Sequence, residues 1–266
     1  MKQQLILIAL LISTAAHAEE APEHTLTGNL SLSTDYRFRG ISQTWKLPAV
    51  QGGLDFADKG GVYLGTWMSN VSGNSYNNGA GLEWDLYGGY KFNMTESVQI
   101  DLGALAYVYP GARLNSAPGV ATNEKYNNVD VYAAVNAGAF SAKLSVAVTD
   151  YFGLNSTTAG YAYFSALPAS GSSKGSAYLD LNYSFDLGSG VSLATHLGRM
   201  EVHHYGDLSY TDYKLGLSKE FSGFSVGAAV VGSDAKRSFY QVADAAGQHA
   251  KRVGTAGLVL SASKTF

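Results

Sequence analysis

Residues 26–39 read LTGNLSLSTDYRFR, and apolar and polar residues alternate along this stretch. One face carries Leu26, Leu30, Leu32, Tyr36 and Phe38, and the other carries Ser31, Ser33, Asp35, Arg37 and Arg39. A period of two is typical of a β-strand, whose successive side chains point to opposite faces. The stretch exceeds the usual strand of about 5–6 residues and suits the roughly 9–11 that a tilted strand needs to cross a bilayer. It therefore predicts a membrane-spanning strand with a polar inner face.

Eleven further segments complete the predicted set of strands: 49–57, 62–71, 82–92, 98–108, 129–136, 140–149, 178–185, 191–200, 210–221, 224–233 and 252–266. The connections alternate between short turns and long polar segments. The short turns lie at 58–61, 93–97, 138–139, 188–190 and 222–223, and the long segments at 41–48, 72–80, 110–127, 152–175, 201–209 and 234–250. Bacterial barrels have short periplasmic turns and long extracellular loops. The sequence thus predicts an all-β fold, a transmembrane antiparallel barrel of about twelve strands with both termini in the periplasm.

The first 18 residues have the features of a secretory signal peptide. Lys2 provides the positive charge, 5–12 form an apolar run too short to span a bilayer as a helix, and Ala16-His17-Ala18 is a small-x-small cleavage site. We expect cleavage after Ala18, which leaves 19–266 as the barrel domain. Loss of Lys2 changes the formal net charge from −3 to −4.

The composition of the chain excludes several classes of protein. Charged residues make up only 15% of it, below the usual quarter of a soluble domain. There is no cysteine, so disulfides and thiol chemistry are ruled out. Beyond the leader no apolar run reaches 18 residues, hence no transmembrane helix is predicted. An acidic chain without phosphate-binding motifs is a poor partner for nucleic acid.

The C-terminal strand carries Leu258, Leu260, Ala262, Lys264 and Phe266 on one face. A terminal aromatic that closes an alternating strand resembles the signal read by the outer-membrane barrel-assembly machinery, and Lys264 departs from the usual apolar residue. We therefore predict that Phe266 is the assembly signal. Aromatic residues near strand ends also predict girdles at the membrane interfaces: Tyr36, Phe38, Tyr63, Tyr90, Phe92, Tyr107, Tyr109, Phe140, Phe185, Phe221, Phe224 and Phe266.

Several blocks of the sequence resemble the TorF-type porin family of proteobacterial outer-membrane barrels. The most specific is GNLSLSTDYRFRGISQT at 28–44, and the others lie at 48–56, 65–71, 83–90 and 210–216. The resemblance covers essentially the whole chain after the leader. It implies a barrel and, by class, a porin; the family has no assigned substrate or functional residues, so no residue role is carried over.

The polar faces of the strands supply candidates for a constriction. Arg37 and Arg39 would lie about 6–7 Å apart along the first strand and point into the lumen. The other candidates are carboxylates and lysines on polar faces: Asp35, Asp55, Glu83, Asp85, Asp101, Asp130, Asp180, Asp212, Lys91, Lys143 and Lys214. Opposed charges would select solutes by a transverse field. The alternative is a salt-bridge network that fills a narrow barrel.

Other motifs predict no chemistry. His203 and His204, near Glu201 and Asp207, have no spacing that enforces a metal geometry, so we interpret them as solvated loop residues. The inward His196 lacks a motif for nucleophilic catalysis. Residues 161–168 form an apolar loop that would fold into the pore or lie on the membrane. The sequence predicts no catalytic residue, metal or cofactor.

The leading hypothesis is an outer-membrane channel for passive diffusion of small hydrophilic solutes. The second is a non-conducting structural or adhesion barrel whose lumen is closed by charges, and an enzyme is a distant third. Only 6 of the 18 basic residues are arginine, which argues against a track for acidic oligosaccharides. The expected partners are outer-membrane lipid and lipopolysaccharide, the assembly machinery and small solutes.

Overall fold

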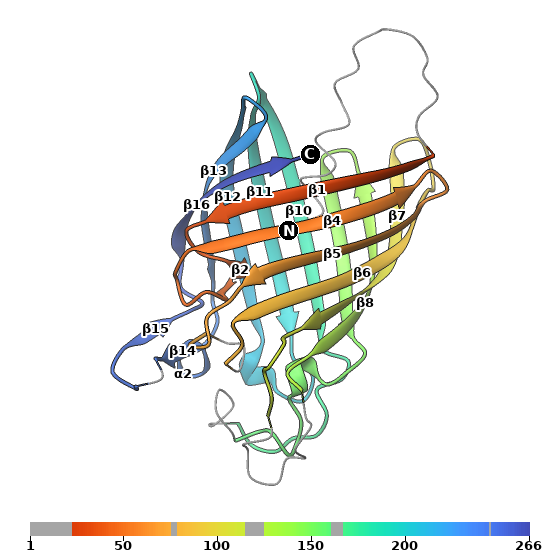
Figure 1. Cartoon of the computed structure of the whole chain (residues 1–266). Helices are drawn as coiled ribbons and strands as arrows, with labels where there is room; N and C mark the ends of the chain where they lie inside the picture. Colours follow the sequence, from red (N-terminus) through yellow and green to blue (C-terminus); the bar gives the residue numbers. More distant parts are fainter. Residues whose placement is uncertain (1–22, 76–78, 115–124, 161–166, 245) are drawn as a thin grey trace, which may run out of the picture.

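Twelve antiparallel strands close into one barrel in a computed structural model that describes residues 23–75, 79–114, 125–160, 167–244 and 246–266 (Figure 1). In chain order the strands are β1 (His24–Ser33), β4 (Ala49–Asp58), β5 (Val62–Asn70), β6 (Leu82–Asn93), β7 (Val98–Val108), β8 (Asn128–Ala137), β9 (Phe140–Ala147), β10 (Ala177–Gly188), β11 (Val191–Glu201), β12 (Tyr210–Phe221), β13 (Phe224–Ser233) and β16 (Gly257–Thr265). The predicted fold is confirmed. The proposed signal peptide lies outside the described residues.

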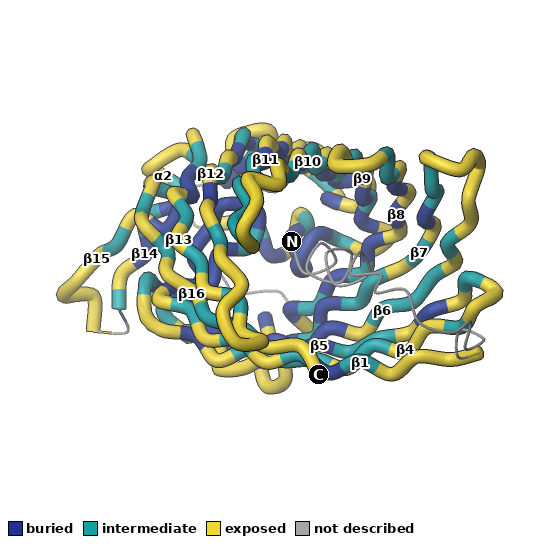
Figure 2. The backbone as a smooth tube through the Cα atoms, turned by 90° about the horizontal axis from the view of Figure 1, so that it is seen from above, coloured by how far each residue is buried: buried dark blue, intermediate teal, exposed yellow. Residues whose placement is uncertain are grey.

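The wall of the barrel is apolar outside and polar inside. On β6, Leu86 is 42% exposed whereas its neighbour Asp85 is only 2% exposed. Exposed and buried positions alternate in this way along the strands (Figure 2). Because each strand is hydrogen-bonded on both sides, the closed sheet leaves no free edge in the wall.

The two ends of the barrel differ as predicted. Short turns join strands at one end, and at Ser222-Gly223 both residues are left-handed (φ 50° and 79°), as in a type I′ hairpin. The other end carries long connections and the small elements β2 (Arg37–Phe38), β3 (Ile41–Ser42), η1 (Tyr151–Gly153), η3 (Gly206–Leu208), α2 (Arg237–Tyr240), β14 (Gln241–Ala243) and β15 (Ala250–Arg252) (Figure 1). Among the described residues, no helix is long and apolar enough to cross a membrane.

Two predicted strand boundaries are wrong. The first strand ends at Ser33 rather than Arg39, because residues 34–48 turn inward and bond to distant parts of the chain. The last strand begins at Gly257 rather than at residue 252, because Ala250–Arg252 pairs with β14 instead of the wall. In both places the alternation of apolar and polar residues extends beyond the residues that pair in the barrel sheet, because tertiary contacts draw the chain away from the wall.

The aromatic girdle prediction holds for one set of residues only. Aromatic side chains that face outward lie on the strands near the short turns: Tyr90, Phe92, Phe140, Phe185, Phe221, Phe224 and Phe266. The prediction is wrong for five residues that face the interior, namely Tyr36, Phe38, Tyr63, Tyr107 and Tyr109. Tyr63 and Tyr107 occupy odd positions on β5 and β7, which are the polar faces of those strands.

The seam between the first and last strands is shorter than its neighbours. Residues 29–33 of β1 pair with 261–265 of β16, whereas all of β1 pairs with β4. Phe266 extends the seam through two backbone hydrogen bonds with Gly28, of 2.7 and 2.9 Å. Its ring also covers Gly28, where an added Cβ would lie 2.5 Å from a ring carbon. Phe266 therefore packs on the closing seam of the barrel.

Phe266→Ala should lower the folded stability by about 1 kcal/mol, because the ring loses its contact with Gly28. It should also reduce the amount of heat-modifiable barrel in the outer membrane, measured on gels of boiled and unboiled samples. Phe221→Ala, at the same rim but away from the seam, is the matched control. Wild-type amounts of folded Phe266→Ala would contradict the predicted assembly role.

Candidate functional site: the barrel lumen

Residues 34–48, which we call the inner segment, fold into the barrel. All residues from Asp35 to Trp45 are buried except the half-buried Phe38. A tight turn at Arg39 and Gly40, with φ of 48° and 78°, joins β2 to β3. At Gly40 an added Cβ would lie 2.5 Å from the Cβ of Asp212 on β12, so only glycine fits there. The inner segment therefore crosses the lumen at the end of the barrel that carries the long connections.

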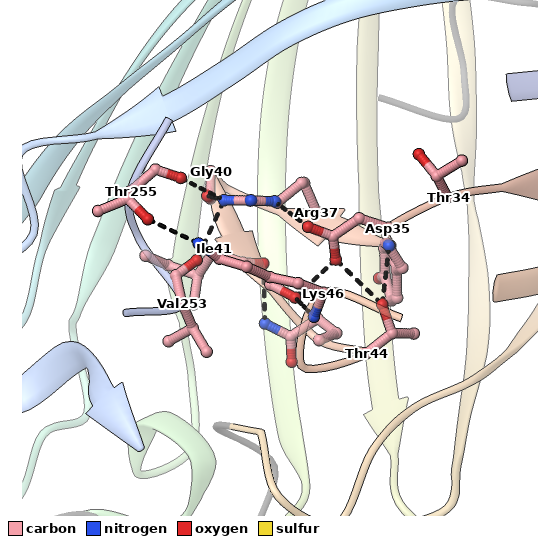
Figure 3. A network of polar contacts seen from close by, with 12 residues as sticks. Thr34, Asp35, Arg37, Gly40, Ile41, Thr44, Lys46, Val253 and Thr255 are labelled. Atoms are coloured by element: carbon pink, nitrogen blue, oxygen red, sulfur yellow. Dashed lines mark hydrogen bonds and ion pairs between the residues drawn. The ribbon is translucent and has the colours of Figure 1, made fainter. Parts of the chain in front are cut away.

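The carboxylate of Asp35 accepts hydrogen bonds from other residues of the inner segment and so stabilises its fold (Figure 3). The donors are Arg37 Nε at 2.6 Å, Ser42 Oγ at 2.6 Å and Thr44 Oγ1 at 3.0 Å. The Nη1 atom of Arg37 donates to the carbonyls of Gly40, Val253 and Thr255 at 3.0–3.1 Å. The predicted position of Arg37 on the first strand is wrong: Arg37 lies on β2 and fastens the inner segment to the chain just before β16.

Lys46 makes a second link between the same two parts of the chain. Its Nζ donates to Thr255 Oγ1 at 2.7 Å (Figure 3). Partial burial lowers the pKa of Lys46, and the nearby Arg37 guanidinium acts in the same direction. Ser42 N also donates to the carbonyl of Val253 at 2.9 Å.

Arg39 reaches the far wall of the barrel. Its Nη2 lies 2.8 Å from Asp130 on β8, and its guanidinium stacks on Phe38 and Tyr178, 4.7 and 4.4 Å from the ring centres. Both partners of the ion pair are buried, Asp130 to 2% exposure. The predicted position of Arg39 on the first strand is wrong, but its pairing with an inward carboxylate agrees with the predicted charge network.

Tyr36 connects the inner segment to β6. Its hydroxyl donates to Glu83 at 2.7 Å, and Tyr109 donates to the same carboxylate at 3.0 Å. Burial raises the pKa of Tyr36 well above its usual value, so the phenol keeps the proton that it donates. Asp85 lies buried on the same face of β6. The two acids are thus placed inward as predicted.

An aromatic cluster packs against the tip of the inner segment. Phe152 lies at its centre, with ring centres of Tyr151, Tyr126 and Tyr107 at 4.7, 5.3 and 5.7 Å. Between this cluster and the inner segment lies a cavity of about 20 Å³, which is room for about one water molecule. The half of the lumen near the long connections is therefore narrowed by packed apolar side chains as well as by charges.

His196 lies midway along the lumen between two carboxylates. Its Nδ1 is 3.0 Å from Asp180 and its Nε2 is 2.8 Å from Asp212. Tyr178 Oη donates to Asp212 at 3.0 Å. Two carboxylate neighbours favour an imidazole with a proton on both nitrogens. Asp180 and Asp212 are thus inward as predicted.

The remaining candidates lie between the middle of the lumen and the short turns. Tyr63 donates to Asp101 at 2.6 Å, and Tyr87 donates to Asp55. The three lysines are half-buried and project from the polar faces of their strands, Lys91 from β6, Lys143 from β9 and Lys214 from β12. In the strand register Lys214 is opposite His196 and Lys143 is opposite Asp180, so both lie at mid-lumen, while Lys91 lies nearer the short turns. The arginines lie nearer the long connections.

The histidine loop contains no metal cluster. The rings of His203 and His204 are adjacent, 3.9 Å apart between centres, but His204 Nδ1 faces the carbonyl of Ser172. Glu201 pairs with Arg199, and Asp207 with Lys236. No group of metal-ligating side chains occurs in the part of the chain that the structure describes. Of the predicted 161–168 loop, 161–166 lie outside the described residues, while Leu167 is buried and Pro168 exposed.

Comparison with known proteins assigns this chain to a family. A family model described as "Bacterial protein of unknown function (Gcw_chp)" matches residues 17–266. The chain belongs to the Gcw_chp family. Among curated proteins, no sequence matches it.

The fold of this Gcw_chp member is shared by solved outer-membrane porins. It is similar to the "KdgM porin", with a TM-score of 0.51 and 8% identity, over 90% of this chain and 99% of that one. The "KdgM porin in complex with disordered oligogalacturonate" gives a TM-score of 0.50 and 8% identity, over 91% and 98%. At this identity the likeness establishes the architecture alone.

Sequence reasoning missed the inner segment and two inward tyrosines of the wall. Tyr63 and Tyr107 share the parity of inward acids on their own or neighbouring strands, so strict alternation would have assigned them to the lumen. For the inner segment the signal was weaker. Gly40, just after the charged run, marks a turn, but nothing local indicates that the turn points inward.

Proposed function

We propose that this protein is an outer-membrane channel for passive diffusion of small hydrophilic solutes. The observation that carries the proposal is the distribution of charge in the wall. Charged and hydroxyl side chains from β4 to β12 face the lumen, while leucine and valine side chains make up most of the outward face. Charge on an inner face is useful to a barrel that passes polar solutes, and charge on a lipid-facing one is costly.

In this proposal the inner segment is the constriction. Loops that fold into a lumen restrict the size of solutes without closing the barrel wall. The segment is held at three places, by β8 through Arg39, by β6 through Tyr36 and by residues 253–255 through Arg37. Solutes would pass beside it and meet the tyrosines and lysines beyond.

The second candidate is a barrel closed by the inner segment. It is favoured by the aromatic cluster around Phe152 and by the full pairing of Arg37 and Arg39, which leave little polar surface in the outer half. Such a barrel would serve a structural or adhesive role. The two candidates differ in whether the intact protein conducts ions.

The proposal includes several further parts. The chain is exported by the signal peptide at 1–18, and 19–266 is inserted by the barrel-assembly machinery among lipid and lipopolysaccharide. Both termini lie in the periplasm, and we assign no enzymatic activity. The blocks at 28–44 and 210–216 support a relationship with the TorF-type porins.

Conductance of purified protein in a planar bilayer tests the proposal. We expect discrete current steps from protein whose folded state has been verified by its heat-modifiable migration. Folded protein that inserts but carries no current would overturn the channel and favour the closed barrel.

A further inference from the structure

Two inward tyrosines, Tyr63 and Tyr132, lie against glycines of the adjacent strands. The hydroxyl end of Tyr63 rests on Gly89 of the adjacent strand, where an added Cβ would lie 2.6 Å from the phenol oxygen. Tyr132 rests in the same way on Gly103, with a corresponding distance of 2.5 Å. Both glycines are inward positions without a side chain. The two rings can therefore lean against the wall instead of projecting across the lumen.

The ammonium groups of two lysines lie over the rings of these tyrosines. Nζ of Lys143 lies 3.7 Å from the ring centre of Tyr132, and Nζ of Lys91 lies 4.6 Å from that of Tyr63. Because the wall occupies one side of each ring, the ammonium groups stand on the side that faces the lumen. Lys214 also follows the wall, with its Cε 3.3 Å from the place of a Cβ on Gly216.

These lysines have no carboxylate partner, although acids lie directly across from two of them. Lys91 is opposite Asp101 and Lys143 is opposite Asp180 in the strand register. Among the described residues, no carboxylate oxygen lies within 4.0 Å of any of the three ammonium groups. Tyr63 donates instead to Oδ1 of Asp101, and His196 and Asn182 both lie within hydrogen-bond distance of Oδ1 of Asp180.

The lysines and the nearby carboxylates therefore differ in their partners. Donors from the wall already lie on Oδ1 of Asp101 and of Asp180. Each lysine ammonium has three N–H donors, and those of Lys91 and Lys143 lie over tyrosine rings. A solute that accepts hydrogen bonds and carries negative charge can use these donors without displacing a partner.

We propose that Lys91, Lys143 and Lys214 form a binding track for small organic anions such as monocarboxylates. The proposal rests on the proposed channel function and names the class of solute for it. Flexible lysines suit solutes that must also leave, since a site in a channel has to bind weakly enough to release its ion. The track lies beyond the inner segment, so it acts after that segment has limited the size of the solute.

The triple variant Lys91→Gln, Lys143→Gln, Lys214→Gln tests the proposal by reversal potentials in a potassium chloride gradient. At about 7 Å one unit charge changes the local concentration of an ion by a factor of roughly 2.7 even at the dielectric constant of water. Screening in about 0.1 M salt halves that energy. Each charge then raises the local chloride concentration about 1.6-fold and lowers that of potassium by the same factor. We therefore expect the chloride-to-potassium permeability ratio to fall roughly 20-fold in the triple variant, and block of the current by added gluconate to be lost.

Three comparisons make the result specific. Lys219→Gln, which removes the same charge from an exposed outward position on β12, should leave the ratio unchanged. The triple Lys→Arg variant should keep most of the wild-type chloride-to-potassium permeability ratio, because arginine carries the same positive charge as lysine. If the triple Gln variant does not fold, Lys143→Gln alone should lower the ratio by about 2.7-fold.

The outcomes also separate this proposal from the channel itself. A conducting wild type whose ratio ignores all the lysine substitutions would overturn the anion track and leave the channel standing. A folded wild type that conducts nothing would overturn both.

Discussion

Replacing Arg39 with methionine is expected to lower the free energy of unfolding by about 3–5 kcal/mol. The substitution leaves Asp130 with its charge on the wall of β8, 2% exposed and without its cation. Asn128 still donates to that carboxylate at 2.7 Å, but an amide does not neutralise the charge. Urea titration of the protein in lipid vesicles, followed by tryptophan fluorescence, measures the change.

A second substitution separates the lost ion pair from lost packing. In Arg39→Met, Asp130→Asn no buried charge remains, so the double variant should recover at least half of the lost stability. Arg199→Met is the matched control, because Arg199 pairs with Glu201 at an exposed site where such pairs contribute about 0–1 kcal/mol. A change in Arg39→Met no larger than that of the control would show that the inner segment is not anchored at β8.

Replacing residues 35–45 by a short glycine-serine turn is expected to raise single-channel conductance several-fold. In the intact chain these residues cross the lumen and pack against the aromatic cluster around Phe152. Their removal leaves a barrel of twelve strands that is open at the end with the long connections, intermediate between filled eight-stranded barrels and wide porins. Planar-bilayer recording on the replaced and intact proteins measures the effect.

A milder variant tests the same point without removing the segment. The double variant Asp35→Asn, Arg37→Gln weakens the hydrogen bonds within the inner segment and those to Val253 and Thr255. The inner segment should then leave the lumen intermittently, and the single-channel current should fluctuate. Equal and steady conductance in the wild type and both variants would mean that the inner segment does not narrow the path. Conductance only after replacement would favour the closed barrel.

The positions of the charged residues bear on both hypotheses that the sequence left open. Arg37 and Arg39 are fully paired, as expected of a filled lumen. Lys91, Lys143 and Lys214 lie between the middle of the lumen and the short turns, without ion-pair partners among the described residues, as expected of a solute path. One lumen thus combines a packed part near the long connections with a polar part towards the short turns. The current carried by the intact protein decides whether solutes pass the packed part.

The sequence by itself determined the wall of the barrel. Alternation along Leu82–Asn93 and its counterparts predicted the number of strands and which acids and lysines face inward, because a period of two is a property of each strand alone. The lengths of the connections likewise predicted the two ends. The local sequence is enough to predict the strands and the two ends of the barrel. Each strand pairs with its neighbours in the same antiparallel way, so closing the barrel requires no other kind of contact.

Only the tertiary structure decided what fills the lumen. The alternation that begins at Leu26 continues to Arg39, yet β1 ends at Ser33, because Asp35, Arg37 and Arg39 find partners that a straight strand would not offer. Those partners are far away in sequence: Arg39 bonds to Asp130 across 91 residues, and Arg37 to Val253 across 216. Pairings over such distances depend on how the closed wall brings β8 and β16 around the inner segment, and a local pattern carries no information about them.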